Sequence, residues 1–152
     1  MIDLSALVPS EKMAGEDSQD TSLLRIMHKE ASGFLSNFAW CEGLRQSFFG
    51  CGVGGVCAVF LFQIVPVSAE VDEWLWVVVG DIPPAYLVTD QATKASIALV
   101  LYVEEMRAWV SAVEAGDSIE ELIPVNVPPT KENAKNLKTR LDCLEQLCIC
   151  SD

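Results

Sequence analysis

The sequence predicts a single α+β domain that consists of N-terminal helices, a three-stranded antiparallel sheet and two C-terminal helices. Three patterns indicate this class: an amphipathic segment from about residue 20, a β-branched and aromatic run over 56–65 that continues into alternating strands, and a second amphipathic segment after residue 90. The 152 residues suffice for one domain, and 51% of them are apolar, which excludes a disordered chain. We divide the chain into an acidic flexible arm, 1–18, and a single α+β domain, 19–152.

Two helices are expected before the sheet. In the first helix, apolar residues recur at spacings of three and four, and Asp20 or Thr21 can cap the first turn. Its apolar stripe is Leu23, Met27, Ala31, Phe34 and Phe38, widened by Leu24 and Leu35. A second, shorter helix is expected over 40–49, because Gly50 would follow its end.

Three strands are expected next, at 56–65, 73–79 and 85–89. The first is almost entirely apolar, which is typical of a central strand that is covered on both faces. The links between the strands are too short for a helical crossover, so the pairing should be antiparallel. The uncharged run 48–69 is long enough to cross a membrane, but its glycines, its β-branched residues and Pro66 favour a turn followed by a strand.

Two helices are expected to complete the domain. Asp90 is positioned to cap the first of them and Gly116 to end it. Pro124 and the Pro128–Pro129 pair then predict an extended connection, and Thr130 can cap the last helix.

The charge of the chain is strongly negative and unevenly placed. The net charge is −12, and residues 70–129 alone carry eleven acids against two bases. Binding to nucleic acid or to an anionic membrane requires a basic face, so neither partner is expected. Acidic charge gathered on one segment steers a basic partner into place. The sequence therefore predicts a protein partner with a basic surface, and we make no prediction of the oligomeric state.

Candidate partner-binding residues occur around the second expected strand. Exposed aromatic side chains ringed by carboxylates can form the energetic centre of an interface. The set is Glu70, Asp72, Glu73, Trp74, Trp76 and Asp81. We predict a small acidic protein-binding module, most concretely a toxin-neutralising, immunity-type protein or another inhibitor that masks a basic partner surface.

The alternative is a small enzyme or ligand-binding protein with a cleft near Asp81 and Tyr86, since a carboxylate beside a phenol can transfer protons. His28, the single histidine, is expected to be a solvated helix residue. A pair formed by Cys41 and His28 is conceivable as nucleophile and base, but their spacing does not bring them together. The glycine run 50–55 precedes a strand and lacks the Lys-Ser/Thr of a phosphate loop. We favour a binding protein over an enzyme and predict no cofactor.

The cysteines are predicted to form neither disulfides nor metal sites. The N-terminus lacks the basic and apolar regions of a secretory signal, so we expect a cytoplasmic protein with reduced thiols. Three cysteines in apolar sequence are expected in the core: Cys41, Cys51 and Cys57. The other three have no known zinc spacing, and one histidine cannot complete a set: Cys143, Cys148 and Cys150.

Two segments resemble a family of small bacterial proteins of unknown function. They are WLWVVVGDIPPAYLVTD at 74–90 and LIPVNVPPT at 122–130. The resemblance implies a bacterial, cytosolic protein of one domain. It implies no activity, ligand or catalytic residue.

Overall fold

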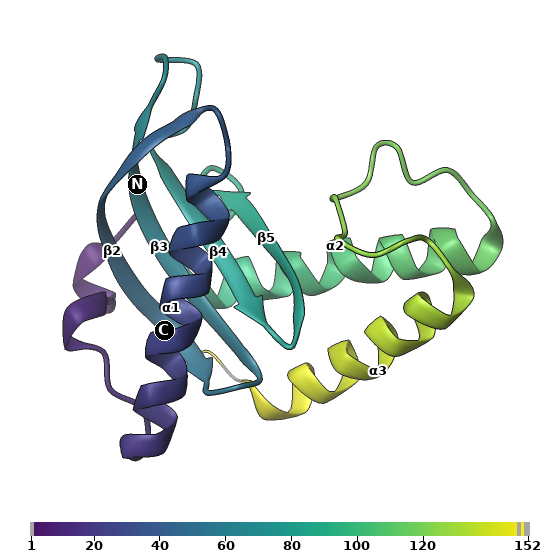
Figure 1. The fold of residues 1–152 in the computed structure, drawn as a ribbon, viewed down its shortest axis with the longest axis horizontal. Helices are drawn as coiled ribbons and strands as arrows, with labels where there is room; N and C mark the ends of the chain where they lie inside the picture. Colours follow the sequence, from purple (N-terminus) through teal and green to yellow (C-terminus); the bar gives the residue numbers. More distant parts are fainter. Residues whose placement is uncertain (1, 149, 151–152) are drawn as a thin grey trace.

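The computed structural model describes residues 2–148 and 150, which form an antiparallel sheet of five strands with helices on both faces (Figure 1). The strands lie in chain order, β1-β2-β3-β4-β5, so each strand pairs with its neighbours in sequence. The 3-10 helices are η1 (Leu4–Ala6) and η2 (Ser10–Lys12); the strands and α-helices are β1 (Val8–Pro9), α1 (Ser18–Ser36), β2 (Cys41–Val53), β3 (Cys57–Pro66), β4 (Trp74–Gly80), β5 (Ile82–Val88), α2 (Ala95–Ala115) and α3 (Lys131–Leu147).

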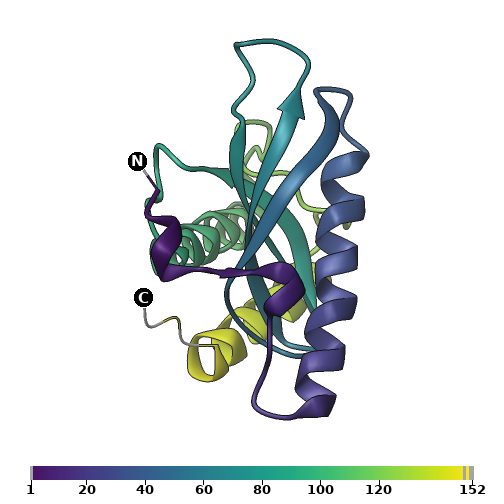
Figure 2. The same cartoon turned by 90° about the vertical axis from the view of Figure 1, so that its left-hand side faces the viewer.

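The sheet lies between two layers of helices, one on each face. Figure 2 shows α1 along one face, and α2 with α3 on the other. On the α1 face, four buried helix residues pack on alternate residues of β3 and β4: Leu24, Met27, Ala31 and Leu35. On the opposite face, the intervening strand residues pack on α2 and α3. β3 is therefore covered on both faces, which explains its almost continuous apolar sequence.

The predicted three-stranded sheet with two preceding helices is wrong. The segment 40–49, predicted as a second helix, belongs mostly to β2, which is paired with β3 along its length. This pairing contains three register shifts, and an extra residue at a bulge moves the next side chains out of the two-residue alternation. The pattern that identifies a strand is therefore broken in β2. The other strand that was not predicted, β1, has only two residues, which is too few to show any periodicity.

Gly50, the first residue of the glycine run 50–55, is required for close packing. It lies in β2, where an added Cβ would come within 2.6 Å of the Ala95 Cβ at the start of α2. The glycine therefore lets the helix approach the strand more closely than any side chain would allow. The run 50–55 thus contributes the end of β2 and the turn into β3.

The helix ends differ in part from the sequence expectations. α1 is capped by Asp17, whose Oδ1 accepts from the Asp20 amide at 2.8 Å. α2 begins only at Ala95, so Asp90 does not cap it. Two expected helix boundaries are confirmed. α2 ends before Gly116, which has a φ of 75°, and α3 begins after Thr130, whose Oγ1 accepts from the Asn133 amide at 3.1 Å.

The N-terminal segment lies along the outer edge of β2. Its strand pairs Val8 with Phe49 and Pro9 with Phe48. Met13, further along, is buried against the α1 face. The flexibility predicted for 1–18 stays a prediction. Within the described residues, no helix combines the length and apolar character needed to cross a bilayer.

Candidate protein-binding groove

A cluster of four aromatic side chains lies where α1 ends. The chain leaves α1 at Ser36 and turns into β2, which places Phe34, Phe38 and Trp40 near Tyr86 of β5. The ring centroids of Phe38 and Trp40 are 4.7 Å apart, and those of Trp40 and Tyr86 are 5.1 Å apart. None of the four is fully buried, and Tyr86 is 37% exposed. The four rings therefore pack on one another and remain accessible to a partner.

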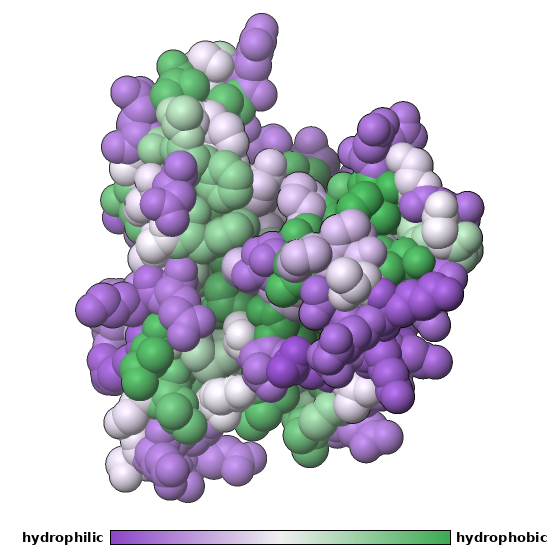
Figure 3. Space-filling model, turned by 45° about the vertical axis from the view of Figure 1, so that its right-hand side comes forward, coloured by the Kyte–Doolittle hydropathy of each residue, from purple (hydrophilic) through white to green (hydrophobic). Residues whose placement is uncertain are grey.

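A groove of about 570 Å³ adjoins this cluster. Its first wall is formed by Phe34, Phe38 and the 84–88 part of β5, and its second wall by the segment 121–126, which follows α2. The second wall is apolar at Leu122, Ile123 and Val125. Figure 3 shows the surface hollowed between the sheet and this segment, with apolar residues on both sides. The volume is sufficient for several side chains of a bound segment.

Carboxylates lie on both sides of the aromatic cluster. Glu105 of α2 and Glu121 line the groove. A smaller hollow on the other side of Tyr86 is lined by Glu70 and Asp72, together with Trp40. The loop that carries these two acids is held in place because the Val67 amide donates to the Trp40 carbonyl at 3.1 Å. Among the described residues, no Lys, Arg or His lines either hollow.

The two predicted anchor tryptophans do not join this cluster. Trp76 is fully buried beneath α2, and its Nε1–H donates to the Ala92 carbonyl at 2.7 Å. It is therefore closed to a partner. Trp74, on the same face of β4, is half-buried against Phe48, at a centroid distance of 6.3 Å. Glu73 lies beside them and accepts a hydrogen bond from Gln63.

Asp81 and Tyr86 do not form a common cleft. Asp81 lies in the turn between β4 and β5, where its Oδ2 is 3.3 Å from Nε of Arg140 on α3. It lines a separate hollow with residues of α1, whereas Tyr86 lines the groove. The structure therefore does not bring together the carboxylate and the phenol that the alternative function requires.

His28 is not the solvated residue that the sequence predicts. Its half-buried imidazole stacks on Phe62, with ring centroids 5.6 Å apart, and its Nε2 lies 2.8 Å from Ser47 Oγ. Ser47 in turn donates to Ser10 Oγ at 2.8 Å. Burial lowers the pKa of His28, and the nearby carboxylate of Glu11 opposes this effect. The three side chains join α1, β2 and the N-terminal segment, and none of them lines the groove.

The cysteines also depart from the sequence expectation. Cys51 and Cys150 form a disulfide, so the prediction of no disulfide is wrong. Cys41, Cys57 and Cys148 are buried thiols, and Cys143 is exposed. Over residues 2–148 and 150, no three His, Cys, Asp or Glu side chains are grouped in a way that could hold a metal ion.

Comparison with known protein families, curated proteins and solved structures finds no match. The resemblance of 74–90 and 122–130 to a small bacterial family stays a prediction. Both segments nevertheless contribute to the groove, the first through Tyr86 and the second through Leu122.

Sequence reasoning missed Phe34, Phe38 and Trp40 as site residues. The first two were assigned to the helix stripe and the third to a helix that does not exist. One local signal was present: the aromatic spacing continues past Asn37, where α1 is already capped. Aromatic residues beyond a helix end cannot pack under that helix, which makes them candidates for a surface cluster.

Proposed function

We propose that this protein is a protein-binding module whose groove takes a basic segment of a partner protein. The observation that carries the proposal is the exposed aromatic cluster with acids on both sides, Glu70 and Asp72 on one and Glu105 and Glu121 on the other. Aromatic side chains supply much of the binding energy at interfaces because they bury large rigid surfaces. Carboxylates at the rim favour a partner segment that carries Lys or Arg.

In its narrower form, the proposal is a toxin-neutralising, immunity-type protein or another inhibitor of bacterial origin. A net charge of −12 attracts a partner whose own surface is basic, and enzymes that attack nucleic acid need such a surface for their substrate. An acidic protein seated on that surface would exclude the nucleic acid. Asp81 lies away from the groove and is paired with Arg140, so it contributes at most to long-range attraction.

We place this binding in the cytoplasm, where the disulfide between Cys51 and Cys150 would be exposed to reducing conditions. The structure holds the closed, oxidised form of this bond, and the placement predicts that the cell keeps most of the protein in the open, reduced form. Alkylation of intact cells before lysis, followed by mass spectrometry of the Cys51 peptide, tests this. A peptide that is wholly disulfide-linked under these conditions would point to an oxidising compartment instead.

The first experiment uses a defined probe, a nine-residue peptide of alternating Arg and Leu, together with its counterpart in which Glu replaces Arg. Isothermal titration calorimetry should detect binding of the basic peptide only. Truncation of the anchors in a Trp40→Ala/Tyr86→Ala variant should weaken binding by roughly 30-fold, which corresponds to about 2 kcal/mol. Equal binding of both peptides, or full binding by this variant, would contradict the proposal.

A matched pair of charge variants separates the groove from general attraction. Glu121→Gln and Asp81→Asn remove the same charge, but only Glu121 lines the groove. The first change should weaken the basic peptide several-fold and reduce its salt dependence, whereas the second should have a much smaller effect. If the two variants weaken binding equally, the peptide is held by net charge alone.

The second experiment identifies the natural partner. The wild-type protein and the Trp40→Ala/Tyr86→Ala variant are used in parallel as baits in an extract of the native cell. A partner of the proposed kind is basic, is retained by the wild type and is lost with the variant. Once that partner is identified, replacing Glu70 and Asp72 by neutral residues should mainly slow association. Replacing Trp40 and Tyr86 by Ala should mainly speed dissociation.

A further inference from the structure

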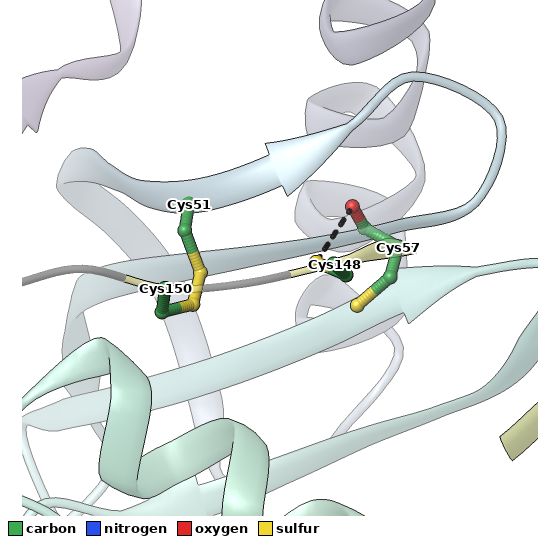
Figure 4. Close-up of a disulfide and its surroundings, with 4 residues drawn as sticks. All are labelled: Cys51, Cys57, Cys148 and Cys150. Atoms are coloured by element: carbon green, nitrogen blue, oxygen red, sulfur yellow. Dashed lines mark hydrogen bonds between the residues drawn. A yellow bond between two sulfur atoms is a disulfide. The ribbon is translucent and has the colours of Figure 1, made fainter. Parts of the chain in front are cut away.

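Four of the six cysteines gather at one place in the fold, away from the groove. Cys51 lies near the end of β2 and Cys57 at the start of β3, on either side of the turn that joins these strands. Cys148 and Cys150 come from the chain after α3. Figure 4 shows them as two adjacent pairs, with Cys51 joined to Cys150 and Cys57 beside Cys148. The disulfide connects residues 99 positions apart in the sequence.

The second pair is held closely but is not bonded. Cys57 is fully buried and Cys148 is 4% exposed. Sγ of Cys148 lies 3.9 Å from the Cys57 carbonyl, to which it donates a weak hydrogen bond. The backbone fixes this position, because the Cys148 amide donates to the Leu144 carbonyl at 2.8 Å in the last turn of α3. The two cysteines are therefore neighbours, which is the first requirement for a disulfide.

We propose that Cys57 and Cys148 are a second disulfide-forming site, which takes a small-molecule disulfide as its oxidant. Together with the disulfide between Cys51 and Cys150, this bond fastens the C-terminal residues to both strands of the β2–β3 hairpin. The proposal does not depend on the function proposed for the groove, since none of the four cysteines lines it.

The reaction is two successive thiol–disulfide exchanges. The Cys148 thiolate attacks one sulfur of the small disulfide, forms a mixed disulfide and releases the first small thiolate. The Cys57 thiolate then attacks the Cys148 sulfur and expels the second small thiolate, and the protons of both cysteines pass to the released thiolates. Two protein thiols are thus oxidised by two electrons, and one small disulfide is reduced to two thiols.

The local environment supports this order of attack. The contact with Cys57 lowers the pKa of Cys148, whereas the same contact together with burial raises the pKa of Cys57. Cys148 is therefore the better thiolate at the start. Once Cys148 is in the mixed disulfide, its side-chain contact no longer raises the pKa of Cys57, and burial is the main cause that remains. Cys148 is also the first residue after α3 and lines a hollow between α2 and α3, from which a small disulfide can approach its sulfur.

The bond would also fix part of the lining of a second hollow. A space of about 510 Å³ lies between α2 and α3, and its lining includes Leu99, Val103 and Leu144 together with Cys148 and Cys150. With both disulfides formed, these two cysteines are fixed in its lining. With both reduced, Cys148 and Cys150 have no covalent bond to the strands.

The test counts free thiols. Reduced full-length protein is exposed to oxidised glutathione, unfolded in an alkylating reagent and examined by mass spectrometry. Of six cysteines, the four in disulfides should be protected, so that two thiols, Cys41 and Cys143, are alkylated. Peptide mapping without reduction should show Cys57 joined to Cys148. Four alkylated thiols, another partner for Cys57, or a stoichiometric zinc ion on the four cysteines would overturn the proposal.

Two single variants provide matched controls. Cys143→Ser removes an exposed thiol outside both pairs and should leave one alkylated thiol, Cys41, after oxidation. Cys57→Ser removes the thiol that resolves the mixed disulfide, so Cys148 should keep a bound glutathione and only Cys41 and Cys143 should be alkylated. Only one alkylated thiol in the Cys57→Ser protein would mean that Cys148 bonds elsewhere, against the proposal.

Discussion

The buried indole of Trp76 provides the sharpest test of the packing described above. It is fully buried between the sheet and α2, and its Nε1–H satisfies the carbonyl of Ala92 in the segment that precedes α2. Trp76→Phe keeps an aromatic ring in place but removes the donor. Trp74→Phe is the matched control, since Trp74 lies on the same face of β4 but is only half-buried.

The expected cost of Trp76→Phe combines two contributions. Leaving a buried carbonyl without its donor costs about 1–3 kcal/mol. The smaller ring loses part of the packing against α2, which adds roughly 1 kcal/mol. The total is about 2–4 kcal/mol, and for a chain of this size each kcal/mol lowers Tm by about 2–4 °C. Trp74→Phe should cost roughly 1 kcal/mol or less.

Urea unfolding followed by far-ultraviolet circular dichroism measures both variants. The midpoint should fall for Trp76→Phe while the denaturant slope stays the same, because the native fold buries nearly the same surface. A loss below about 0.5 kcal/mol, or an equal loss for both variants, would refute the assignment of Trp76 to a hydrogen-bonded core position.

Three further predictions concern other elements. Gly50→Val should destabilise the protein by at least about 2 kcal/mol in urea unfolding, because even a Cβ at this position meets the Ala95 Cβ at 2.6 Å. Thr130→Ala should cost about 1 kcal/mol through loss of the cap on Asn133, a change that Thr130→Ser should largely avoid. Folding lowers the pKa of His28 below its ordinary value of 6.5, so the unfolded chain binds the proton more readily. The His28 contribution to stability is therefore complete above about pH 6.5 and falls as the pH drops from there through the lower pKa of the folded state. In His28→Asn this decline should be absent from unfolding free energies measured across that range, and an unchanged pH profile would show that His28 is not its source.

The elements with regular periodicity could be predicted from the sequence, and the irregular ones could not. β4 is a continuous apolar run from Trp74 to Val79, and α3 keeps its apolar spacing from Ala134 to Leu144, so both were located closely. The first part of β2 was mistaken for a helix because its register shifts remove the alternation and because Gly50 was interpreted as the residue after a helix end.

The groove could not be predicted from the sequence for a different reason. Its walls come from three segments, 34–38, 84–88 and 121–126, whose proximity depends on where α1 and α2 cross the sheet. No pattern within any one segment encodes that crossing. Tyr86 was identified as a site residue from its local sequence, but it was paired with Asp81, which lies close in sequence and faces α3 instead.

The two-residue strand β1 has a consequence for how the protein avoids associating with itself. β2 is 13 residues long, and without a cover its outer edge would offer unpaired amides and carbonyls to the strand of another molecule. β1 occupies part of that edge, and its Pro9 has no amide to donate outward. The N-terminal residues thus protect the protein from edge-to-edge aggregation, and light scattering of a chain that lacks residues 1–12 would reveal the exposed strand.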